Sequence, residues 1–370
     1  MTPRRIAGIL LAAGSAERMG FDKLTTPLAG KTALLRSAEA LVQGGVTELV
    51  AAVSERTRET ARLLSVGVPV RIAEGGATRQ DSVYRALLAA EGADIAVIHD
   101  AARCLVTPEI VRASIASAEA FGSGIAAIPL VDTLLRRDET GRIAVVPREN
   151  VFRMQTPQTF RYREILDSYK RADGAATDDC TLYMQAGYTP RFIPGSEENF
   201  KLTTPEDFIR AERLLTRYGT GFDTHRLVPG RKLILGGVEI PFETGLLGHS
   251  DADVLTHAIM DALLGAASLP DIGHLFPDSD PAYLGADSIE LLGRVRELLA
   301  EKGLRPVHVS AEIIAQRPKL APYLSAMRRA LACALDVDAD AVALSATTTE
   351  GMNDEGRGLC MSARAVASVR

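Results

Sequence analysis

Short apolar runs alternate with segments of helical period along the first third of the chain. The runs IAGILLAAG (6–14), ELVAAVS (48–54) and DIAVIHDAA (94–102) are apolar almost throughout, which is typical of strands buried on both faces. The segments between them repeat apolar residues about every 3.6 positions, as amphipathic helices do. This alternation predicts an α/β fold, a mostly parallel sheet with helices on both faces and a ligand site beyond the carboxyl ends of its strands.

The pattern after residue 216 predicts a second domain. A helix over about 205–215 begins at Pro205 and closes the first half, and TRYGT (216–220) is a short junction. Beyond it we expect a smaller layered domain, α+β or α/β, so that the domains are 1–216 and 217–370. The elements expected there are strands at 232–240, 307–316 and 342–350 and helices from about 250, 288 and 320.

Charge and composition exclude several classes of partner. Residues 1–215 carry 27 basic and 27 acidic side chains and residues 216–370 carry 15 and 20, so we expect no nucleic-acid partner. The apolar runs are shorter than the roughly 20 residues of a membrane span, so we expect no membrane partner either. The four cysteines are widely spaced without a C-x-x-C pair, which predicts a reducing, cytoplasmic location.

The loop after the first strand has features of a phosphate site. LLAAGSAERMGFDK (10–23) is a strand followed by a turn of small residues, whose backbone N–H groups can approach a phosphate closely. Arg18 and Lys23 could then neutralise charge on a transferring phosphoryl group. The stretch has neither the Walker A nor the G-x-G-x-x-G spacing. A solvated turn with two surface cations therefore explains these residues equally well.

Two further motifs of the first half offer ligand contacts. Asp100 ends an apolar strand within IHDAAR, where a carboxylate can hold Mg²⁺ against a nucleoside triphosphate. The alternative is that Asp100 caps the helix that follows. In EGGATRQDSV (74–83), a Gly-Gly turn precedes Ser82 at a helix start, where its hydroxyl could contact a base or a ribose.

The second half carries a candidate metal site. In GFDTHR (221–226), Asp223 and His225 alternate along an extended segment, so their side chains point to the same face. On the helix expected from about Ser250, His257 lies between Asp253 and Asp261 in a stripe that recurs every four residues. Asp, His and His form a ligand set for Zn²⁺ with an open fourth position, and Asp253 or Asp261 could orient the His257 ring. The alternative is a core histidine hydrogen-bonded to Asp253.

A second cation could bind near Glu350. This residue follows a threonine run and precedes an acidic, glycine-rich loop, and its carboxylate could hold Mg²⁺ or Mn²⁺ on phosphate oxygens. The threonine run is also typical of a strand end without any further role.

Seven motifs follow one another in order along residues 5–215. They are AAGSAERMG, EGG with DSV, HDAAR, VDT after a proline, QTPQ, TDD and NFKLTTPEDF. In this order they resemble the 2-C-methyl-D-erythritol 4-phosphate cytidylyltransferase family, which implies a Rossmann-like nucleotidyltransferase fold. The resemblance implies that Arg18 and Lys23 stabilise the pentavalent phosphorus, with Mg²⁺ beside Asp100. The residues it implies around the nucleotide and the acceptor are Gly14, Gly75, Gly76, Ser82, Asp100, Arg103, Thr133, Arg148, Thr177 and Lys201.

The motifs GFDTHR, GLLGHSDADVLTHA, DIGHLFPD, IIAQRPKL, ATTTE and GRG occupy residues 218–370. They resemble 2-C-methyl-D-erythritol 2,4-cyclodiphosphate synthase, which implies an α+β domain with Zn²⁺ on Asp223, His225 and His257. His249 and Thr348 would stabilise the transition state, and Glu350 would hold the second cation. The substrate-binding residues that the resemblance implies are Ser250, Asp271, Ile272, Gly273, Phe276, Asp278, Asp280, Ala315, Lys319, Thr347, Thr349, Glu350 and Arg357.

Together the resemblances imply one chain with two enzymes of the non-mevalonate isoprenoid pathway. One converts CTP and 2-C-methyl-D-erythritol 4-phosphate to CDP-methylerythritol and diphosphate. The other converts CDP-methylerythritol 2-phosphate to the 2,4-cyclodiphosphate and CMP. Synthases of this family are trimers, so we expect a homotrimer or higher multiple. A kinase acts between the two steps and is a possible partner. Ala16 and Leu24 depart from the first family's loop, which keeps open the alternative of a nucleotide-binding scaffold or regulator. A closer alternative is an enzyme with another acceptor or nucleotide, but Lys201 and Arg148 favour the methylerythritol acceptor.

Overall fold

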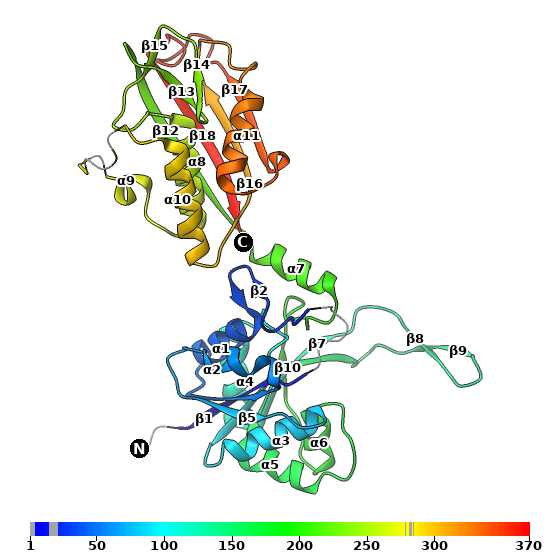
Figure 1. Ribbon diagram of the computed structural model, residues 1–370. Helices are drawn as coiled ribbons and strands as arrows, with labels where there is room; N and C mark the ends of the chain where they lie inside the picture. The colour runs from blue at the N-terminus through cyan, green and yellow to red at the C-terminus, as the bar shows by residue number, and fades with distance from the viewer. Residues whose placement is uncertain (1–3, 15–20, 278, 281–282, 284) are drawn as a thin grey trace. The chain divides into compact units, whose positions relative to one another are not determined.

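The computed structural model describes residues 4–14, 21–277, 279–280, 283 and 285–370. It forms two compact units, residues 1–211 and 212–370 (Figure 1). The helix predicted at 205–215 is confirmed as α7 (Pro205–Leu215), which spans the division between the units. Arg18 and Asp278, to which the sequence assigns roles, lie outside the described residues.

The first unit is built on a seven-stranded sheet, and the predicted mostly parallel arrangement is confirmed. The strand β10, which the apolar pattern had not revealed, is antiparallel to both of its neighbours, whereas the other pairs are parallel. In sheet order the strands are β11 (Phe192–Pro194), β7 (Ser123–Pro129), β10 (Phe152–Arg161), β6 (Ile95–Asp100), β1 (Ile6–Ala12), β4 (Glu48–Val53) and β5 (Val70–Glu74).

Helices cover both faces of this sheet, as predicted (Figure 1). On one face α1 packs against α4, and on the other α3, α5 and α6 pack together. The start of α3 is fixed by Thr78, whose side chain accepts a hydrogen bond from Asp81 N while the Asp81 carboxylate accepts one from Thr78 N. The helices are α1 (Ala33–Gln43), α2 (Glu55–Arg62), α3 (Arg79–Ala89), α4 (Pro108–Phe121), α5 (Tyr162–Arg171) and α6 (Asp179–Gln185).

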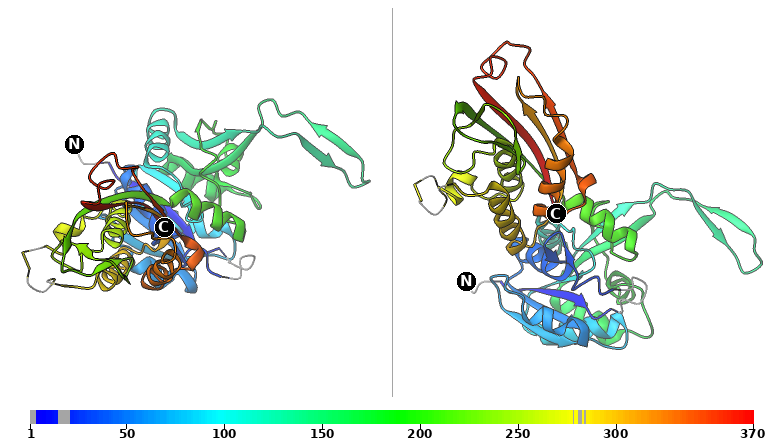
Figure 2. Two further views of the ribbon diagram at one scale, coloured as in Figure 1. Left: turned by 90° about the horizontal axis from the view of Figure 1, so that it is seen from above. Right: turned by 45° about the horizontal axis from the view of Figure 1, so that its top comes forward.

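Two hairpins complete the first unit. The shorter pairs β2 (Pro27–Leu28) with β3 (Lys31–Thr32), and the longer pairs β8 (Leu134–Arg137) with β9 (Ile143–Val146). Figure 2 shows the longer hairpin extending away from the sheet of its own unit. Every side chain of its two strands is exposed except that of Val146, which is half-buried.

The second unit has a five-stranded sheet in which only β16 and β17 are parallel, so the predicted α+β class is confirmed. The strand predicted at 232–240 is instead a hairpin of β13 (Leu233–Leu235) and β14 (Val238–Ile240). The chain turns there at two glycines with φ of 56° and 71°, a conformation that suits glycine. The sheet order is β15 (Thr244–Leu246), β12 (Arg217–Pro229), β18 (Cys360–Val369), β16 (Pro306–Ile314) and β17 (Val342–Thr347).

One face of this sheet carries the helices (Figure 1). The central helix α8 packs against β12 and β18, and α10 packs against both α8 and α11. On the uncovered face, Tyr218, Phe222 and Val366 are exposed large apolar side chains. The helices are α8 (Val254–Ala266), α9 (Ile272–Leu275), α10 (Ser288–Glu301) and α11 (Leu324–Leu335), with a 3₁₀ turn at Ala339–Ala341.

Two expectations about the environment can be compared with the structure. All four cysteines are free thiols. Among the helices that the structure describes, none is long and apolar enough to cross a membrane.

Candidate active sites of the two units

A cavity of about 350 Å³ lies at the carboxyl end of β1 and β6 in the first unit, the edge at which a ligand site was predicted. Small residues such as Gly14 and Gly76 are among its lining, and Gly76 is required there because a Cβ at that position would lie 2.2 Å from Asp81 Cβ. Ser82 Oγ accepts a hydrogen bond from Gly76 N at 2.9 Å and holds this turn against α3. The charged side chains on the cavity wall are Lys23, Arg79, Asp100 and Lys201.

Asp100 is the only carboxylate among the cavity-lining residues that the structure describes. Its Oδ2 accepts a hydrogen bond from Lys201 Nζ at 2.7 Å, and its Oδ1 lies 3.3 Å from Arg79 Nε. Burial opposes ionisation of this carboxyl, but Arg79 and Lys201 outweigh it and hold its pKa below the usual range. Asp100 is therefore an anion at neutral pH, at the edge of a cationic cavity.

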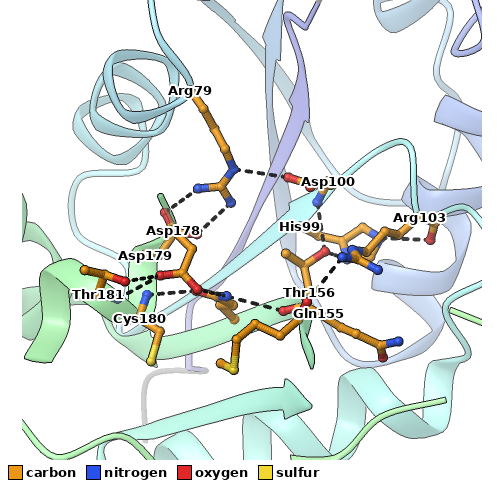
Figure 3. A network of polar contacts seen from close by, with 12 residues as sticks. Arg79, His99, Asp100, Arg103, Gln155, Thr156, Asp178, Asp179, Cys180 and Thr181 are labelled. Carbon is orange, nitrogen blue, oxygen red and sulfur yellow. Dashed lines mark hydrogen bonds and ion pairs between the residues drawn. The ribbon is translucent and has the colours of Figure 1, made fainter. Parts of the chain in front are cut away.

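Arg79, which lines the cavity, is paired with the buried carboxylate of Asp179 (Figure 3). The two terminal nitrogens of Arg79 pair with the carboxylate of Asp179 at 3.1 and 2.7 Å. Asp179 is fully buried and also accepts a hydrogen bond from the Tyr169 hydroxyl. Arg79 thus spans two carboxylates, because its Nε lies beside Asp100.

The backbone of the Asp100 turn is held by a second group (Figure 3). Asp100 N donates to Thr156 Oγ1 at 3.1 Å, and Thr156 Oγ1 lies 3.0 Å from His99 Nδ1. The other ring nitrogen of His99 lies 3.2 Å from Arg103 O, a carbonyl that can only accept. Since that contact needs the proton on Nε2, Nδ1 accepts from Thr156. Full burial lowers the pKa of His99 to about 4, so the ring is neutral.

In the second unit, three potential metal ligands converge. Asp223 Oδ2 lies 2.9 Å from His225 Nε2 and 3.0 Å from His257 Nδ1, and the two ring nitrogens are 3.2 Å apart. Burial opposes ionisation of Asp223, but hydrogen bonds from both histidines hold its pKa below the usual range. Burial likewise lowers the pKa of His257, but Asp223 outweighs it and raises that pKa above its ordinary value. Two imidazole nitrogens and a carboxylate oxygen are a donor set suited to a tetrahedral Zn²⁺ with one open position.

The His257 ring is oriented by hydroxyl groups. Its Nε2 lies 3.2 Å from Ser250 Oγ and 3.1 Å from Ser288 Oγ, which leaves Nδ1 facing Asp223. The predicted orienting role of Asp253 or Asp261 is wrong. Asp253 caps α8 through Thr256 N at 3.1 Å, and Asp261 accepts from Ile272 N at 2.9 Å.

The helix predicted from about Ser250 begins at Val254 with Asp253 as its N-cap. The alternative in which His257 is a core histidine bonded to Asp253 is excluded by the same contacts, because the carboxylate of Asp253 accepts from Gly237 N and Thr256 instead.

A cavity of about 400 Å³ opens beside these three residues. His249 lines it, and its Nε2 is buried without a hydrogen-bond partner among the described residues. A second cavity of about 420 Å³ in the same unit shares no lining residue with the first. Its lining includes Ala315, Lys319, Thr347 and Thr348.

The family model described as 2-C-methyl-D-erythritol 4-phosphate cytidylyltransferase matches residues 6–217, and the model of the YgbB family matches residues 216–370. The bifunctional enzyme IspD/IspF of Desulforudis audaxviator is 42% identical and aligns with 98% of this chain and 96% of its own length. This chain belongs to the bifunctional IspD/IspF family. It is therefore an enzyme of isoprenoid-precursor biosynthesis with two activities, a cytidylyltransferase and a cyclodiphosphate synthase.

Other members of the bifunctional IspD/IspF family are similar along the whole chain. The enzyme of an Anaeromyxobacter species (strain Fw109-5) is 42% identical, over 98% of this chain and 97% of its own. A solved structure of the bifunctional IspDF from Campylobacter jejuni is 30% identical, covers 99% of this chain and 98% of its own, and has a TM-score of 0.49.

In the IspD-like unit, the structure brings together only part of the predicted set. Arg103 turns away from the cavity and donates to Asn199 O at 2.8 Å. Thr133 and Arg148 flank the strands of the extended hairpin, and Arg148 donates to Val131 O. Thr177 is exposed before α6, and Gly75 lies beside the cavity without lining it. The predicted residues that line the cavity are Gly14, Lys23, Gly76, Ser82, Asp100 and Lys201.

In the IspF-like unit, the predicted residues fall into three groups. The first lines the cavity beside the metal cluster and comprises His249, Ser250, Ile272, Gly273 and Phe276. The second lines the separate cavity and comprises Ala315, Lys319, Thr347 and Thr348. The third lines neither cavity and comprises Asp271, Asp280, Thr349, Glu350 and Arg357. Asp271 caps α9, where its carboxylate accepts from His274 N at 2.9 Å.

Sequence reasoning missed several residues of these sites. Arg79 and Asp179 belong to quoted motifs, EGGATRQDSV and TDD, but nothing local indicates that they pair across 100 positions. Ser288 lies 31 positions from His257 and follows an aspartate, which reads as an ordinary helix start. His99 adjoins Asp100 in the sequence, and only its complete burial in the structure sets it apart from an ordinary strand residue.

Proposed function

We propose that the cavity beside Asp100 is the cytidylyltransferase site and that the cluster of Asp223, His225 and His257 is the cyclodiphosphate synthase site. The observation that carries this assignment is the convergence, within 4.8 Å, of three ligand atoms beside a cavity in the second unit. In the first unit, an ionised carboxylate among cations supports the corresponding assignment.

Residues of the first cavity fit a magnesium–nucleotide complex, because Asp100 offers an ionised carboxylate oxygen, the ligand that Mg²⁺ prefers. Bound there, Mg²⁺ would neutralise negative charge on the phosphates of CTP. Lys23, with Arg18, neutralises charge on the pentavalent phosphorus. Lys201 binds the phosphate of the acceptor.

The reaction at this site needs no covalent enzyme intermediate. A phosphate oxygen of methylerythritol phosphate attacks the α-phosphorus of CTP, and diphosphate leaves with the electrons of the broken P–O bond. Catalysis is then positioning and charge neutralisation. The test is diphosphate release from CTP, which should require methylerythritol phosphate and Mg²⁺. Diphosphate release with no acceptor added, or with an unrelated sugar phosphate at equal rate, would overturn the acceptor assignment.

In the second unit, we propose Zn²⁺ on Asp223, His225 and His257. Bound there, Zn²⁺ would polarise a phosphate oxygen as a Lewis acid. The 2-phosphate of the substrate attacks the β-phosphorus, and CMP leaves. We propose that His249, which lines the same cavity and whose Nε2 has no partner among the described residues, donates a hydrogen bond to a phosphate oxygen in the transition state.

We further propose that Glu350 holds the second cation, Mg²⁺ or Mn²⁺, and that a complete site needs more than one copy of the chain. Glu350 has a φ of 51° and accepts from Thr348 Oγ1 at 2.9 Å, a strained conformation of the kind that clusters at functional sites. Neither residue lines the cavity beside His257. The exposed apolar side chains Tyr218 and Phe222 on the uncovered sheet face also favour association, and we propose a homotrimer or higher multiple.

Mixing two inactive variants tests the shared site. We expect His257→Ala and Glu350→Gln chains each to lack synthase activity, and their mixture, after exchange of subunits, to regain part of it. Recovery requires that one chain supply the zinc ligands and another supply Glu350. Absence of recovery in mixed oligomers confirmed by native mass spectrometry would contradict a shared site, and a monomer by the same method would contradict the assembly.

Association with the kinase that acts between the two steps is a further proposal, which rests on the chemistry of the products. CDP-methylerythritol lacks the 2-phosphate that the synthase requires, so another enzyme must add it. Sedimentation of the full chain with the purified kinase at micromolar concentration should give a complex. Independent sedimentation of the two proteins would contradict it. The cytoplasmic location expected from the cysteine pattern also stays a prediction.

A further inference from the structure

We propose that Arg79 and Asp179 are positioning residues of the first site, which hold the Asp100 carboxylate in the orientation that binds the nucleotide-bound cation. This proposal rests on the assignment of Asp100 to the magnesium–CTP site. Neither Arg79 nor Asp179 needs to bind the cation itself, because Asp179 acts on Arg79 and Arg79 acts on Asp100.

Arg79 and Asp179 form a bidentate ion pair, in which the planar guanidinium faces the carboxylate. Both terminal nitrogens of Arg79 engage Asp179, at 3.1 and 2.7 Å. Such bidentate pairs fix direction as well as distance. The plane of the guanidinium is thereby set by a residue outside the cavity, and its Nε is directed at Asp100 Oδ1, 3.3 Å away.

Burial of Asp179 makes its ion pair with Arg79 costly to break. Asp179 is fully buried, and a buried carboxylate left without its cation is strongly destabilised. The hydroxyl of Tyr169 donates to the same carboxylate, and the Tyr169 ring stacks on Tyr84 with centroids 6.2 Å apart. Three helices, α3, α5 and α6, therefore contribute to the position of one guanidinium.

The two cationic partners of Asp100 differ in how readily they can leave. Within the described part of the chain, Lys201 makes a single polar contact, through an ammonium group on a flexible stem, and its side chain is 39% exposed. Arg79 is tied to a second carboxylate and cannot follow Asp100 if it turns. A cation that enters the cavity can therefore displace Lys201 from Oδ2, while Arg79 keeps Oδ1 in place.

The test uses the full chain with three variants, Arg79→Lys, Asp179→Asn and the double variant. Lysine keeps the charge of Arg79 but cannot span two carboxylates. We expect the half-saturating Mg²⁺ concentration for diphosphate release to rise about tenfold or more in each, as is usual when an outer partner of a metal ligand is lost. Mn²⁺ binding in the presence of CTP, followed by electron paramagnetic resonance, should weaken in parallel without any turnover.

The double variant shows whether Asp179 acts through Arg79. If it does, the double variant should lose no more than the worse single variant, because the second change removes an interaction already lost. Multiplied losses would overturn that part of the proposal. Arg112→Gln on α4 is the matched control, since Arg112 is an exposed arginine of the same unit that pairs, among the described residues, only with Glu109 and Gln43 O. It should leave Mg²⁺ dependence unchanged.

A purely structural role predicts a different outcome. Variants that lower the melting temperature but leave the half-saturating Mg²⁺ concentration and the KM for CTP within about twofold would overturn the positioning role. If Arg79→Lys or Asp179→Asn does not fold, Tyr169→Phe removes one hydrogen bond from Asp179 and should give a smaller shift in the same direction. No shift in that variant would equally overturn the proposal. Synthase activity in the second unit serves as an internal control and should not change.

Asp100→Asn distinguishes a failure of the site assignment from a failure of the positioning proposal. If it leaves Mg²⁺ dependence unchanged, the assignment of Asp100 to the cytidylyltransferase site fails. If Asp100→Asn weakens Mg²⁺ binding whereas the variants of Arg79 and Asp179 do not, only the positioning proposal fails.

Discussion

Nδ1 of His257 lies 3.0 Å from Oδ2 of Asp223, although the two residues are 34 positions apart and belong to a helix and a strand. Two glycines of β12 allow this approach. A Cβ at Gly221 would lie 2.0 Å from Ala258 O, and one at Gly219 would lie 2.2 Å from Ala262 O. Because side chains alternate along a strand, Asp223 and His225 follow these glycines on the face that contacts α8.

Loss of a ligand should release the metal. Replacing His257 by alanine leaves one carboxylate and one imidazole, so zinc bound per chain should fall at least about tenfold from near-stoichiometric. Metal analysis after gel filtration measures it. His308→Ala, at an exposed histidine of β16, is the control and should retain its zinc. Stoichiometric zinc in the His257 variant would contradict the ligand set.

The close approach of α8 to β12 predicts a steric effect. Gly221→Ala should push the helix from the strand and lower the free energy of unfolding by roughly 2 kcal/mol or more, as overpacking does. Zinc affinity should fall with it, because His257 moves away from Asp223. Gly293→Ala on α10 is the matched control, since nothing lies within 4 Å of a Cβ there. Equal urea midpoints for the two variants would refute the close-packing account.

Asp253 should prove structural. Its carboxylate accepts hydrogen bonds from Gly237 N, Thr256 N and Thr256 Oγ1 and is fully buried. Asp253→Asn replaces one acceptor by a donor that faces other donors, so the free energy of unfolding should fall by about 1–3 kcal/mol. Zinc content of the folded protein should stay the same. Zinc loss from a fully folded variant would instead place Asp253 in the metal site.

His99 predicts a pH dependence in the first unit. Its pKa is about 4 in the folded protein against about 6.5 when exposed, so the unfolded chain takes up a proton first as pH falls. The stabilisation is fully present above pH 6.5 and is lost towards pH 4, up to about 3 kcal/mol in the free energy of unfolding. Urea unfolding at several pH values should show that the free energy of unfolding depends less steeply on pH in His99→Gln than in the unchanged chain. Identical slopes would contradict the buried neutral histidine.

Much of the metal cluster was predictable because it rests on local periodicity. Asp223 and His225 share a strand face by the period of two, and His257 was identified from a helical stripe. The role of Asp253 was not predictable, because an aspartate at this position could either lie in the helical stripe beside His257 or cap the helix. The observed helix start at Val254 makes it the N-cap.

The strand β10 shows a different limit. Gln155, Thr156, Gln158 and Thr159 are buried in it, against the expectation that buried strands are apolar. Their polar groups are satisfied by distant partners, such as Asp178 for Gln158 at 3.1 Å. Apolar patterning cannot detect such a strand. The pair of Arg79 and Asp179 escaped prediction for the same reason, because its partners meet only after folding.

We propose that the two activities depend on separate sites, one built around Asp100 and the other around the cluster of Asp223, His225 and His257, and two variants of the full chain test this claim directly. Both reactions should be assayed on Asp100→Asn and His257→Ala. We predict that Asp100→Asn loses diphosphate release from CTP but keeps CMP release from CDP-methylerythritol 2-phosphate within about twofold, and that His257→Ala does the reverse. Loss of both activities in either variant, or of neither, would contradict the claim.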